Sequence, residues 1–336
     1  MKKIGIFISI FFILGLVFTG CGNSKENNTS SNKNTASSIR VGFPGTGNNT
    51  ASDLLAIAVD KGYFKDELKG VDVKVTNFTG AGPEINEALA SKNLDIGVYG
   101  DTPSITAKAN GIDTVLIGAG NTALDAAILV NPDSTIKSVK DLKGKKIAAT
   151  KGSYMHRTLV EMLKANGISI DDVNFINMKS NDAESALFSK NVDAIVLDSI
   201  QVGKLVVNKQ AKVLLDCKNY PEWKGMNLVV ARSQFAKENP DIVVKFIKAY
   251  NKAKDFLDKN PDEAKAIWAK SGVSKAAFDY LYPGSKFGDT FNVEISKDTI
   301  QKLSYTEKFL LDNNLLKNNL DINTWVDNSY YEKSLK

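Results

Sequence analysis

The feature that most constrains the fold is an alternation of short apolar runs with segments of helical spacing, which begins at Ile39. The apolar runs at 39–45, 71–78, 94–100 and 113–120 predict strands. The segments between them repeat their apolar residues at helical spacing. This order is typical of a parallel sheet with helices on both faces, so we predict an α/β fold.

The same rhythm restarts after residue 121 and predicts a second lobe. Further strands are predicted at 126–130, 144–150, 173–178, 192–198, 211–216 and 226–232, which would complete a second sheet. From about Pro240 the pattern is entirely helical, with one apolar stripe along 240–260. We expect this helical tail to return to the first lobe.

These patterns predict two lobes with a ligand between them. We assign residues 39–121 plus 236–336 to lobe 1 and residues 122–235 to lobe 2. In open α/β sheets the ligand binds at the carboxyl ends of the strands, which places a cleft between the lobes. Closure would occur about hinge segments near 121–125 and 231–236.

The N-terminus indicates export and lipid attachment. Lys2 and Lys3 precede an apolar run that ends at Phe18, and small residues precede Cys21. We therefore predict a lipoprotein signal peptide at 1–20 and a lipidated Cys21; a plain signal peptide with a chance cysteine is the alternative. The polar segment 21–38 predicts a flexible tether. Such a chain would be held on the outer, extracytoplasmic face of the bacterial cell membrane.

Composition argues against several classes of function. The net charge is only +5 over 336 residues, and no concentrated basic footprint for nucleic acid occurs. With one histidine and two cysteines, a His/Cys metal site and a disulfide framework are not expected. Dinucleotide, P-loop and nucleophile-elbow motifs do not occur. We expect a protein that is not an enzyme and has no cofactor and no metal.

Four loops of small residues follow predicted strands and suit an anion. Small residues let a ligand approach the backbone, and a helix N-terminus offers unpaired N–H groups. For any single loop, a tight turn or cap explains the same residues. The candidate contacts are Thr46, Gly47, Gly82, Gly100, Asp101, Thr102, Gly152 and Ser153, with Asn121 added from the first hinge segment.

The stretch 149–162, ATKGSYMHRTLVEM, places His156 and Arg157 at a predicted helix N-terminus. The helix dipole disfavours cations there unless an anion occupies that end. Ser153 is the predicted cap, and the alternative for Arg157 is an exposed pair with Glu161. Asp101 and Asp198 end strands in different lobes; we expect Asp101 to cap a helix and Asp198 to meet a cation, with a carboxylate pair as the alternative.

The stretches GVYGDTPSI and KGSYMHRTL, with the lipobox and tether, resemble the solute-binding components of ABC importers. The resemblance is to the aliphatic sulfonate, taurine and nitrate branch, which has the type II periplasmic-binding-protein fold. It implies that Gly100, Asp101 and Thr102 contact the ligand from one lobe. It implies that Ser153, Tyr154 and His156 contact it from the other, with Asp198 at the cleft. The chain has VLDSI where the family often has a Trp-Asp-Pro run.

The resemblance implies capture of a small anionic or zwitterionic ligand, a sulfonate or taurine, for ABC permease subunits with a cytoplasmic ATPase. Asp198 would pair with the ammonium of a zwitterion or meet a nearby lysine. Nitrate and a thiamine-pyrimidine precursor are alternative ligands. A pyrimidine synthase on this fold would need an iron-binding cysteine cluster, and a sensor would need a membrane receptor. We expect a monomer.

Overall fold

The computed structural model describes residues 36–45, 51, 53–285 and 287–336. The chain divides into two units, Met1–Asn34 and Thr35–Lys336, and the description concerns the second. The predicted signal peptide, Cys21, most of the tether, Thr46 and Gly47 lie outside the described residues. None of the described helices is long and apolar enough to cross a membrane.

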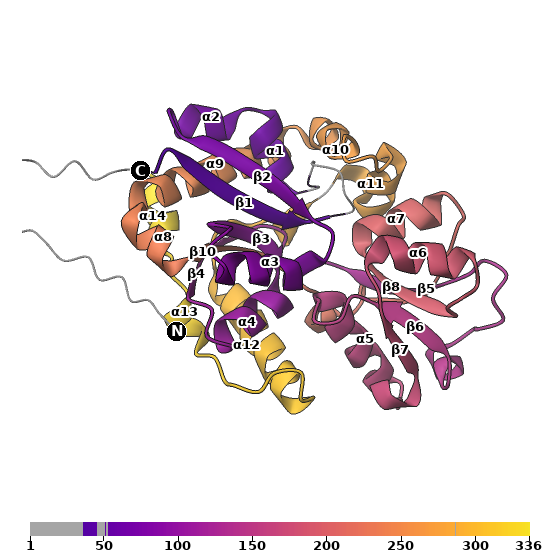
Figure 1. Cartoon of the computed structure of the whole chain (residues 1–336). Coiled ribbons are helices and arrows are strands. Elements are labelled where there is room, and N and C mark those ends of the chain that lie inside the picture. The colour runs from indigo at the N-terminus through magenta and orange to yellow at the C-terminus, as the bar shows by residue number, and fades with distance from the viewer. Residues whose placement is uncertain (1–35, 46–50, 52, 286) are drawn as a thin grey trace, which may run out of the picture. The chain divides into compact units, whose positions relative to one another are not determined.

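The first sheet has five strands in the order β2-β1-β3-β10-β4 (Figure 1). β1 is parallel to both β2 and β3, whereas β10 is antiparallel to β3 and to β4. The strands are β1 Ser38–Pro44, β2 Asp72–Phe78, β3 Ile96–Gly100, β4 Thr114–Ala119 and β10 Asn227–Arg232. This sheet and the helices on it form the first lobe.

The second sheet also has five strands, in the order β7-β6-β8-β5-β9. β6 is parallel to β7 and β8, while β5 is antiparallel to β8 and β9. The strands are β5 Ala126–Val130, β6 Lys146–Ala149, β7 Asn174–Asn177, β8 Ala194–Asp198 and β9 Lys212–Asp216. This sheet and its helices form the second lobe.

All ten predicted strands are confirmed, but two expectations about their arrangement are wrong. Both sheets are mixed rather than parallel. The strand at 226–232 does not complete the second sheet, because β10 lies between β3 and β4 in the first. The chain therefore returns to the first lobe between Asp216 and Asn227, and not near 231–236. A fully apolar run predicts a buried strand but does not say which sheet buries it.

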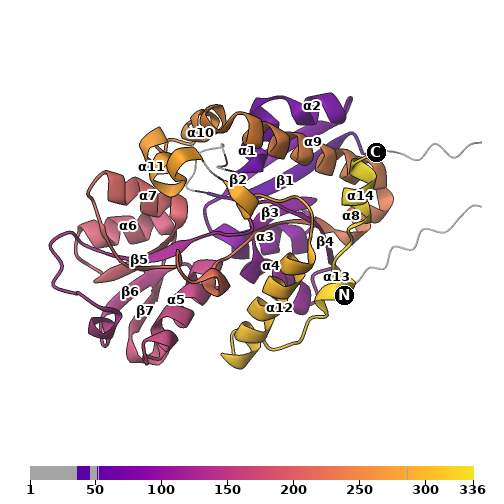
Figure 2. The same cartoon turned by 180° about the vertical axis from the view of Figure 1, so that it is seen from behind.

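Helices cover both sheets, as Figures 1 and 2 show. Those along the first lobe are α1 Leu54–Asp60, α2 Tyr63–Glu67, α3 Ala81–Ala90, α4 Asp101–Ala109 and α8 Ser233–Glu238. Those of the second lobe are α5 Tyr154–Ala165, α6 Ser180–Phe188 and α7 Ser199–Val207. The predicted cap of α5 is confirmed, because the Ser153 Oγ accepts a hydrogen bond from the His156 N–H at 3.3 Å.

The helical tail returns to the first lobe, as expected. Its helices are α9 Pro240–Lys259, α10 Pro261–Ala269, α11 Lys275–Leu281, α12 Lys297–Asp312, α13 Ile322–Trp325 and α14 Ser329–Ser334. α9 packs on α1 and α2, and α12 packs on α4. α11 instead packs on α7 of the second lobe. A Cβ at Gly203 of α7 would lie 3.1 Å from the Ala277 carbonyl oxygen, so glycine permits this close approach.

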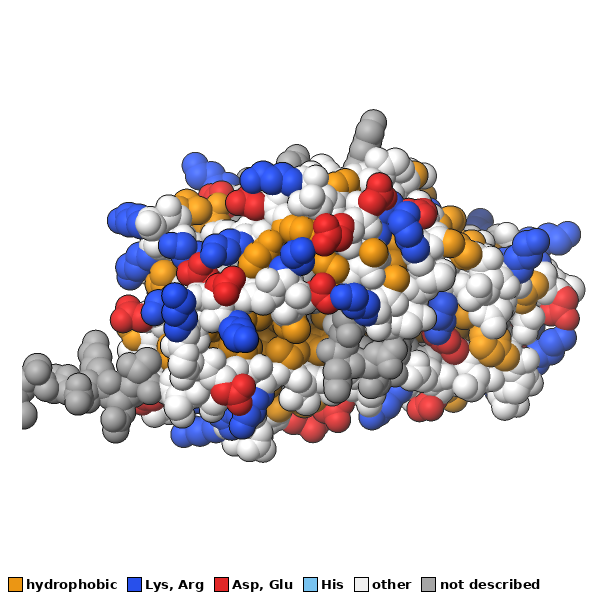
Figure 3. All heavy atoms as spheres, turned by 90° about the horizontal axis from the view of Figure 1, so that it is seen from above, with side chains coloured by type: hydrophobic (Ala, Val, Ile, Leu, Met, Phe, Trp, Pro, Cys, Tyr) orange, Lys and Arg blue, Asp and Glu red, His pale blue; other side chains and the backbone are white. Residues whose placement is uncertain are grey.

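Each sheet is buried on both faces by its helices. One core of the first lobe joins β1 to α1 and α9, and a second joins β3 and β4 to α3 and α12. The second lobe likewise has one core under α5 and another under α6 and α7. The surface seen in Figure 3 mixes basic and acidic side chains without a large patch of one sign, in keeping with the dispersed lysines of the sequence.

Candidate functional site

A cavity of about 270 Å³ is lined by residues of both lobes. Phe43, Pro44 and Asp198 line it from the carboxyl ends of β1 and β8, as the rule for open α/β sheets predicts. Asn227 lines it from the amino end of the antiparallel β10. Apolar side chains supply much of the lining, which is usual for small-molecule sites. They include Phe43, Leu124, Tyr154, Met155, Ile200 and Val273.

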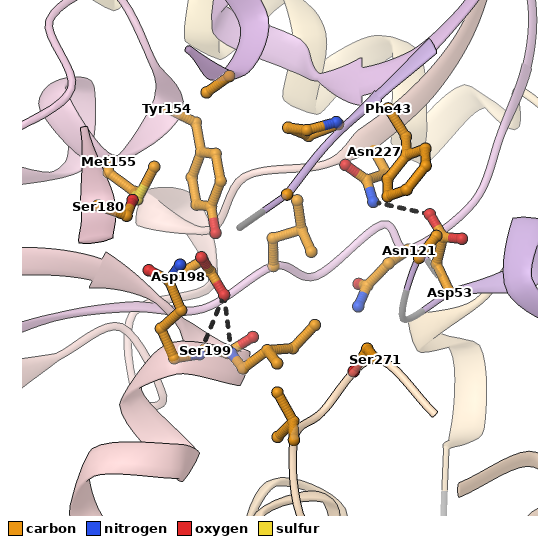
Figure 4. Close-up of a pocket in the computed structure, with 18 of the residues that line it drawn as sticks. Phe43, Asp53, Asn121, Tyr154, Met155, Ser180, Asp198, Ser199, Asn227 and Ser271 are labelled. Atoms are coloured by element: carbon orange, nitrogen blue, oxygen red, sulfur yellow. Dashed lines mark hydrogen bonds between the residues drawn. The ribbon is translucent and has the colours of Figure 1, made fainter. Parts of the chain in front are cut away.

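The first-lobe wall contains a buried carboxylate, Asp53, just before α1. Asp53 Oδ1 accepts a hydrogen bond from the Leu55 N–H at 2.8 Å, and Oδ2 accepts one from the Asn227 side-chain amide at 3.2 Å. Figure 4 shows this second bond at the edge of the cavity. Burial raises the pKa of Asp53 to about 6. Both carboxylate oxygens are thus engaged by the protein.

The N-terminus of α3 also lies on the first-lobe wall, where Ala81 and Gly82 line the cavity. No side chain caps this helix, although the Gly80 N–H donates to Glu84 Oε2 at 2.6 Å. The first N–H groups of a helix lack partners within the helix and carry partial positive charge. A Cβ at Gly82 would lie 2.2 Å from the Pro103 ring, so close packing on α4 accounts for this glycine.

Tyr154 of α5 lines the cavity and contacts the two segments that cross between the lobes, one between β4 and β5 and one between β9 and β10. Its hydroxyl donates to the Asp125 carbonyl oxygen at 3.3 Å. A Cβ at Gly225 would lie 2.6 Å from the Tyr154 ring, so the ring packs directly on this backbone. Figure 4 shows the hydroxyl pointing toward Asp198. Burial raises the pKa of Tyr154 well above its usual value.

On the second-lobe wall, Asp198 caps α7. Its Oδ1 accepts hydrogen bonds from the Ile200 N–H at 3.0 Å and the Gln201 N–H at 3.2 Å (Figure 4). Desolvation raises the pKa of this carboxyl. The nearby Lys204 Nζ contacts Glu184 Oε2 at 2.7 Å and Oε1 at 2.9 Å, so its charge is already paired. Asp198 therefore caps a helix, and it makes no ion pair with a lysine among the described residues; its pairing with a ligand ammonium stays a prediction.

Residues of the helical tail and of the segment between β4 and β5 also line the cavity. The Asn121 side-chain amide donates to the Tyr282 hydroxyl at 3.3 Å, and its Oδ1 accepts from the Ala123 N–H at 2.9 Å. Gly82, Asn121, Tyr154 and Asp198 are the predicted site residues that line the cavity. Sequence analysis missed Asp53, Gln201, Asn227 and Tyr282; an acidic residue before an apolar helical run could have indicated Asp53.

The remaining predicted residues do not line this cavity, and their assignment to a ligand stays a prediction. They are Gly100, Asp101, Thr102, Gly152, Ser153 and His156. Asp101 is the first residue of α4 and meets a cation instead of capping the helix: its Oδ2 lies 3.7 Å from Arg157 Nη2. Among the described residues, Asp198 thus caps a helix and Asp101 meets a cation, the reverse of the expected assignment.

His156 is buried and uncharged at neutral pH. Its ring packs on Phe175 with a centroid separation of 4.7 Å, and Nδ1 accepts a 3.5 Å hydrogen bond from the Gly152 N–H. Burial and, to a lesser degree, Lys151 lower its pKa to about 4. His156 therefore adds no positive charge to the N-terminus of α5.

Arg157 is fully buried, so the alternative of an exposed Arg157 is wrong, while its pairing with Glu161 is confirmed. Arg157 Nη1 lies 2.9 Å and 3.0 Å from the two Glu161 oxygens. Nε donates to Thr102 Oγ1 at 3.1 Å, and Nη2 donates to the Lys224 carbonyl oxygen at 3.0 Å. The cation thus joins the two lobes outside the cavity lining.

Known proteins resemble this chain in sequence and in fold. A protein of Bacillus subtilis (strain 168) named for the binding of aliphatic sulfonates is 32% identical over 100% of this chain and 98% of its own. The alkanesulfonate-binding protein SsuA from Xanthomonas axonopodis pv. citri bound to MOPS aligns with a TM-score of 0.76 and 23% identity. The alignment covers 88% of this chain and 99% of that one.

The desulfurization enzyme DSZB has the same fold, with a TM-score of 0.69 and 18% identity over 89% of this chain and 98% of its own. The fold of periplasmic binding proteins therefore accommodates both binding and catalysis. The family model described as NMT1/THI5 like matches residues 49–264. Together with the relative that matches the whole length, this match shows that the chain belongs to the NMT1/THI5-like family.

Proposed function

We propose that this chain is the solute-binding lipoprotein of an ABC importer and captures a small sulfonate between its two lobes. The observation that carries the proposal is a cavity that both lobes line, with an uncapped helix N-terminus on one wall. A full-length relative named for binding aliphatic sulfonates supports the choice of ligand class.

The sulfonate group would bind at the N-terminus of α3. Ala81 and Gly82 line the cavity at the start of α3. The first N–H groups of a helix lack helical partners, and the helix dipole favours an anion there. Ala81 has φ of +56°, a strained value for a residue with a side chain, and such strain is common at ligand sites. The binding needs no free cationic side chain, which fits the pairing of Lys204 with Glu184.

The organic part of the ligand would contact the aromatic and aliphatic walls. Phe43, Leu124 and Tyr154 line the cavity from three separate segments. They would provide the apolar contacts that a tryptophan before Asp198 gives in relatives with the Trp-Asp-Pro run, where this chain has Leu197. A micromolar dissociation constant corresponds to ~8 kcal/mol, which a few amide bonds and apolar contacts can supply.

Delivery of the ligand to the permease would need closure of the two lobes and attachment of the protein to the membrane. The lobes are joined by the crossings between β4 and β5 and between β9 and β10, which are the natural hinges. The closed form would dock on permease subunits served by a cytoplasmic ATPase. Lipidated Cys21 would hold the monomer on the outer face of the cell membrane.

The described cavity lining does not favour an enzyme. Cys217 is buried outside the lining, and desolvation raises the pKa of its thiol to about 12, so its thiolate is suppressed. His156 also lies outside the lining. Acyl or sulfonyl chemistry requires a nucleophile paired with a base, and neither Cys217 nor His156 is placed in the described lining to serve as one.

A thermal-shift panel with the full chain in mild detergent tests the proposal. The probes are taurine, propane-1-sulfonate, sulfate, nitrate and a thiamine-pyrimidine precursor. A ligand at 100 times its dissociation constant stabilises the folded state by ~2.7 kcal/mol, so a sulfonate should raise the melting temperature by several degrees. A shift with nitrate or the pyrimidine alone would overturn the sulfonate assignment.

A further inference from the structure

The second-lobe end of the cavity contains a buried hydrogen-bond acceptor with no partner. Gln201 lines the cavity, and the residue is only 5% exposed. Its Oε1 has no hydrogen-bond partner among the described residues. A buried amide oxygen left unpaired is costly, and native proteins rarely leave one so. A donor from the ligand would satisfy it.

Asp198, three residues earlier, adds negative charge at the same place. Both hydrogen bonds that it accepts within the described structure go to Oδ1, which leaves Oδ2 able to accept another. The contrast is Asp53 on the opposite lobe, where the Leu55 N–H and the Asn227 amide engage one oxygen each. Asp198 and Gln201 therefore form an acceptor-rich corner, which we name the α7 corner.

The α7 corner is unsuited to an anion. The N–H groups of Ile200 and Gln201 at the start of α7 are already bonded to Asp198. Lys204, one turn further along, is held by both oxygens of Glu184. A sulfonate placed here would face a carboxylate without a free cation, and like charges at close range repel each other.

The N-terminus of α3, on the first lobe, has the opposite character. Its first residues, Ala81 and Gly82, line the cavity, and no side chain of the N-cap residue engages their N–H groups. The cavity therefore has donors on a first-lobe wall and acceptors on a second-lobe wall. A ligand with an anion at one end and an N–H donor at the other satisfies both walls when the lobes close on it.

We propose that the α7 corner selects ligands that carry an amine, so that the substrate class is aminosulfonates rather than plain alkanesulfonates, with Gln201 as a specificity-determining residue. This inference rests on the proposed function, because the sulfonate end is taken from it. The ammonium donates to Gln201 Oε1 and to Asp198 Oδ2, a charge-assisted interaction in the second case.

Calorimetric titration of the full chain with two matched probes tests the inference. Taurine and propane-1-sulfonate have the same number of heavy atoms, and the ammonium of one replaces the terminal methyl of the other. Taurine should bind at least tenfold more tightly. Equal affinity, or tighter binding of propane-1-sulfonate, overturns the inference but leaves the proposed function standing. If neither probe binds, the proposed function itself is wrong.

Two variants separate the role of Gln201 from a general loss of structure. Gln201→Met should weaken taurine at least fivefold and leave propane-1-sulfonate within twofold. Gln201→Glu keeps an acceptor and adds negative charge, so it should retain or tighten taurine binding. Gln301→Met, on the exposed face of α12, is the matched control and should change neither affinity. Loss of taurine binding in Gln201→Glu would show that Gln201 acts as a donor and would overturn the inference.

Discussion

Arg157 of α5 and Asp101 of α4 pair across the boundary between the lobes, with Nη2 3.7 Å from Oδ2 and neither side chain exposed. The Thr306 hydroxyl holds Asp101 Oδ2 at 3.3 Å from α12. Glu161 binds the other side of the guanidinium, and burial raises its pKa to about 7. This network attaches the second lobe to the first outside the ligand cavity.

Removal of the buried cation should strongly destabilise the fold. Arg157→Met leaves Asp101 and Glu161 without their partner, and breaking a buried pair typically costs about 3–5 kcal/mol. Urea unfolding measures the change. Arg40→Met is the matched control, because Arg40 is partly exposed and Asp95 keeps Arg232 at 2.7 Å. A loss at position 157 no larger than at position 40 would contradict the role of the network.

His156 should make the protein more sensitive to acid. Its pKa is lowered to about 4 in the folded state, so the unfolded chain binds the proton more readily between about pH 4 and 6.5. Stability from this group is complete above pH 6.5 and is lost as the pH falls toward 4. The variant His156→Gln loses packing at every pH but escapes this loss. In urea unfolding, the variant should have a lower free energy of unfolding than the unmodified chain at pH 7.5, and this difference should shrink by about 2 kcal/mol at pH 4.5. A difference that does not change with pH would refute the assignment.

The contact between Tyr154 and Gly225 should control ligand affinity. In Gly225→Ala the new Cβ would lie 2.6 Å from the ring, so Tyr154 must move from its place in the cavity. The affinity for taurine should fall at least tenfold in calorimetric titration. In Gly120→Ala, in the other crossing, the Cβ meets only an ordinary contact at 3.8 Å, and affinity should stay within twofold. Equal effects of the two variants would disprove a specific role for the tyrosine.

The N-terminus of α3 offers a test of the sulfonate position. Glu84 accepts the Gly80 N–H, and its negative charge opposes an anion bound at this helix end. Glu84→Gln keeps an acceptor and removes the charge, so sulfonate affinity should rise about two- to fivefold, the size expected of helix-end charges. Glu87→Gln, on the exposed face one turn later, should have no comparable effect. Unchanged affinity in Glu84→Gln would argue that the sulfonate binds elsewhere.

Periodicity predicted the strands well, because central strands such as β3 and β5 are fully buried and edge strands such as β2 alternate between exposed and partly buried residues. It did not predict that β10 lies between β3 and β4, since sheet membership depends on contacts between distant segments. The predicted Tyr154 and Asp198 line the cavity because Tyr154 begins α5 and Asp198 ends β8, and such element ends face the space between the lobes. Tyr282 could not be predicted, because the tail brings it to the site through the packing of α10 and α11. Arg157 looked like part of an anion site in sequence, yet tertiary structure pairs it with two carboxylates.

The most direct test of the account is a crystal structure of the chain bound to taurine. The account predicts one taurine in the cavity between the lobes, with sulfonate oxygens at the amides of Ala81 and Gly82 and the ammonium at Asp198 and Gln201. A sulfonate found instead at the N-terminus of α5, beside Ser153 and His156, would contradict it.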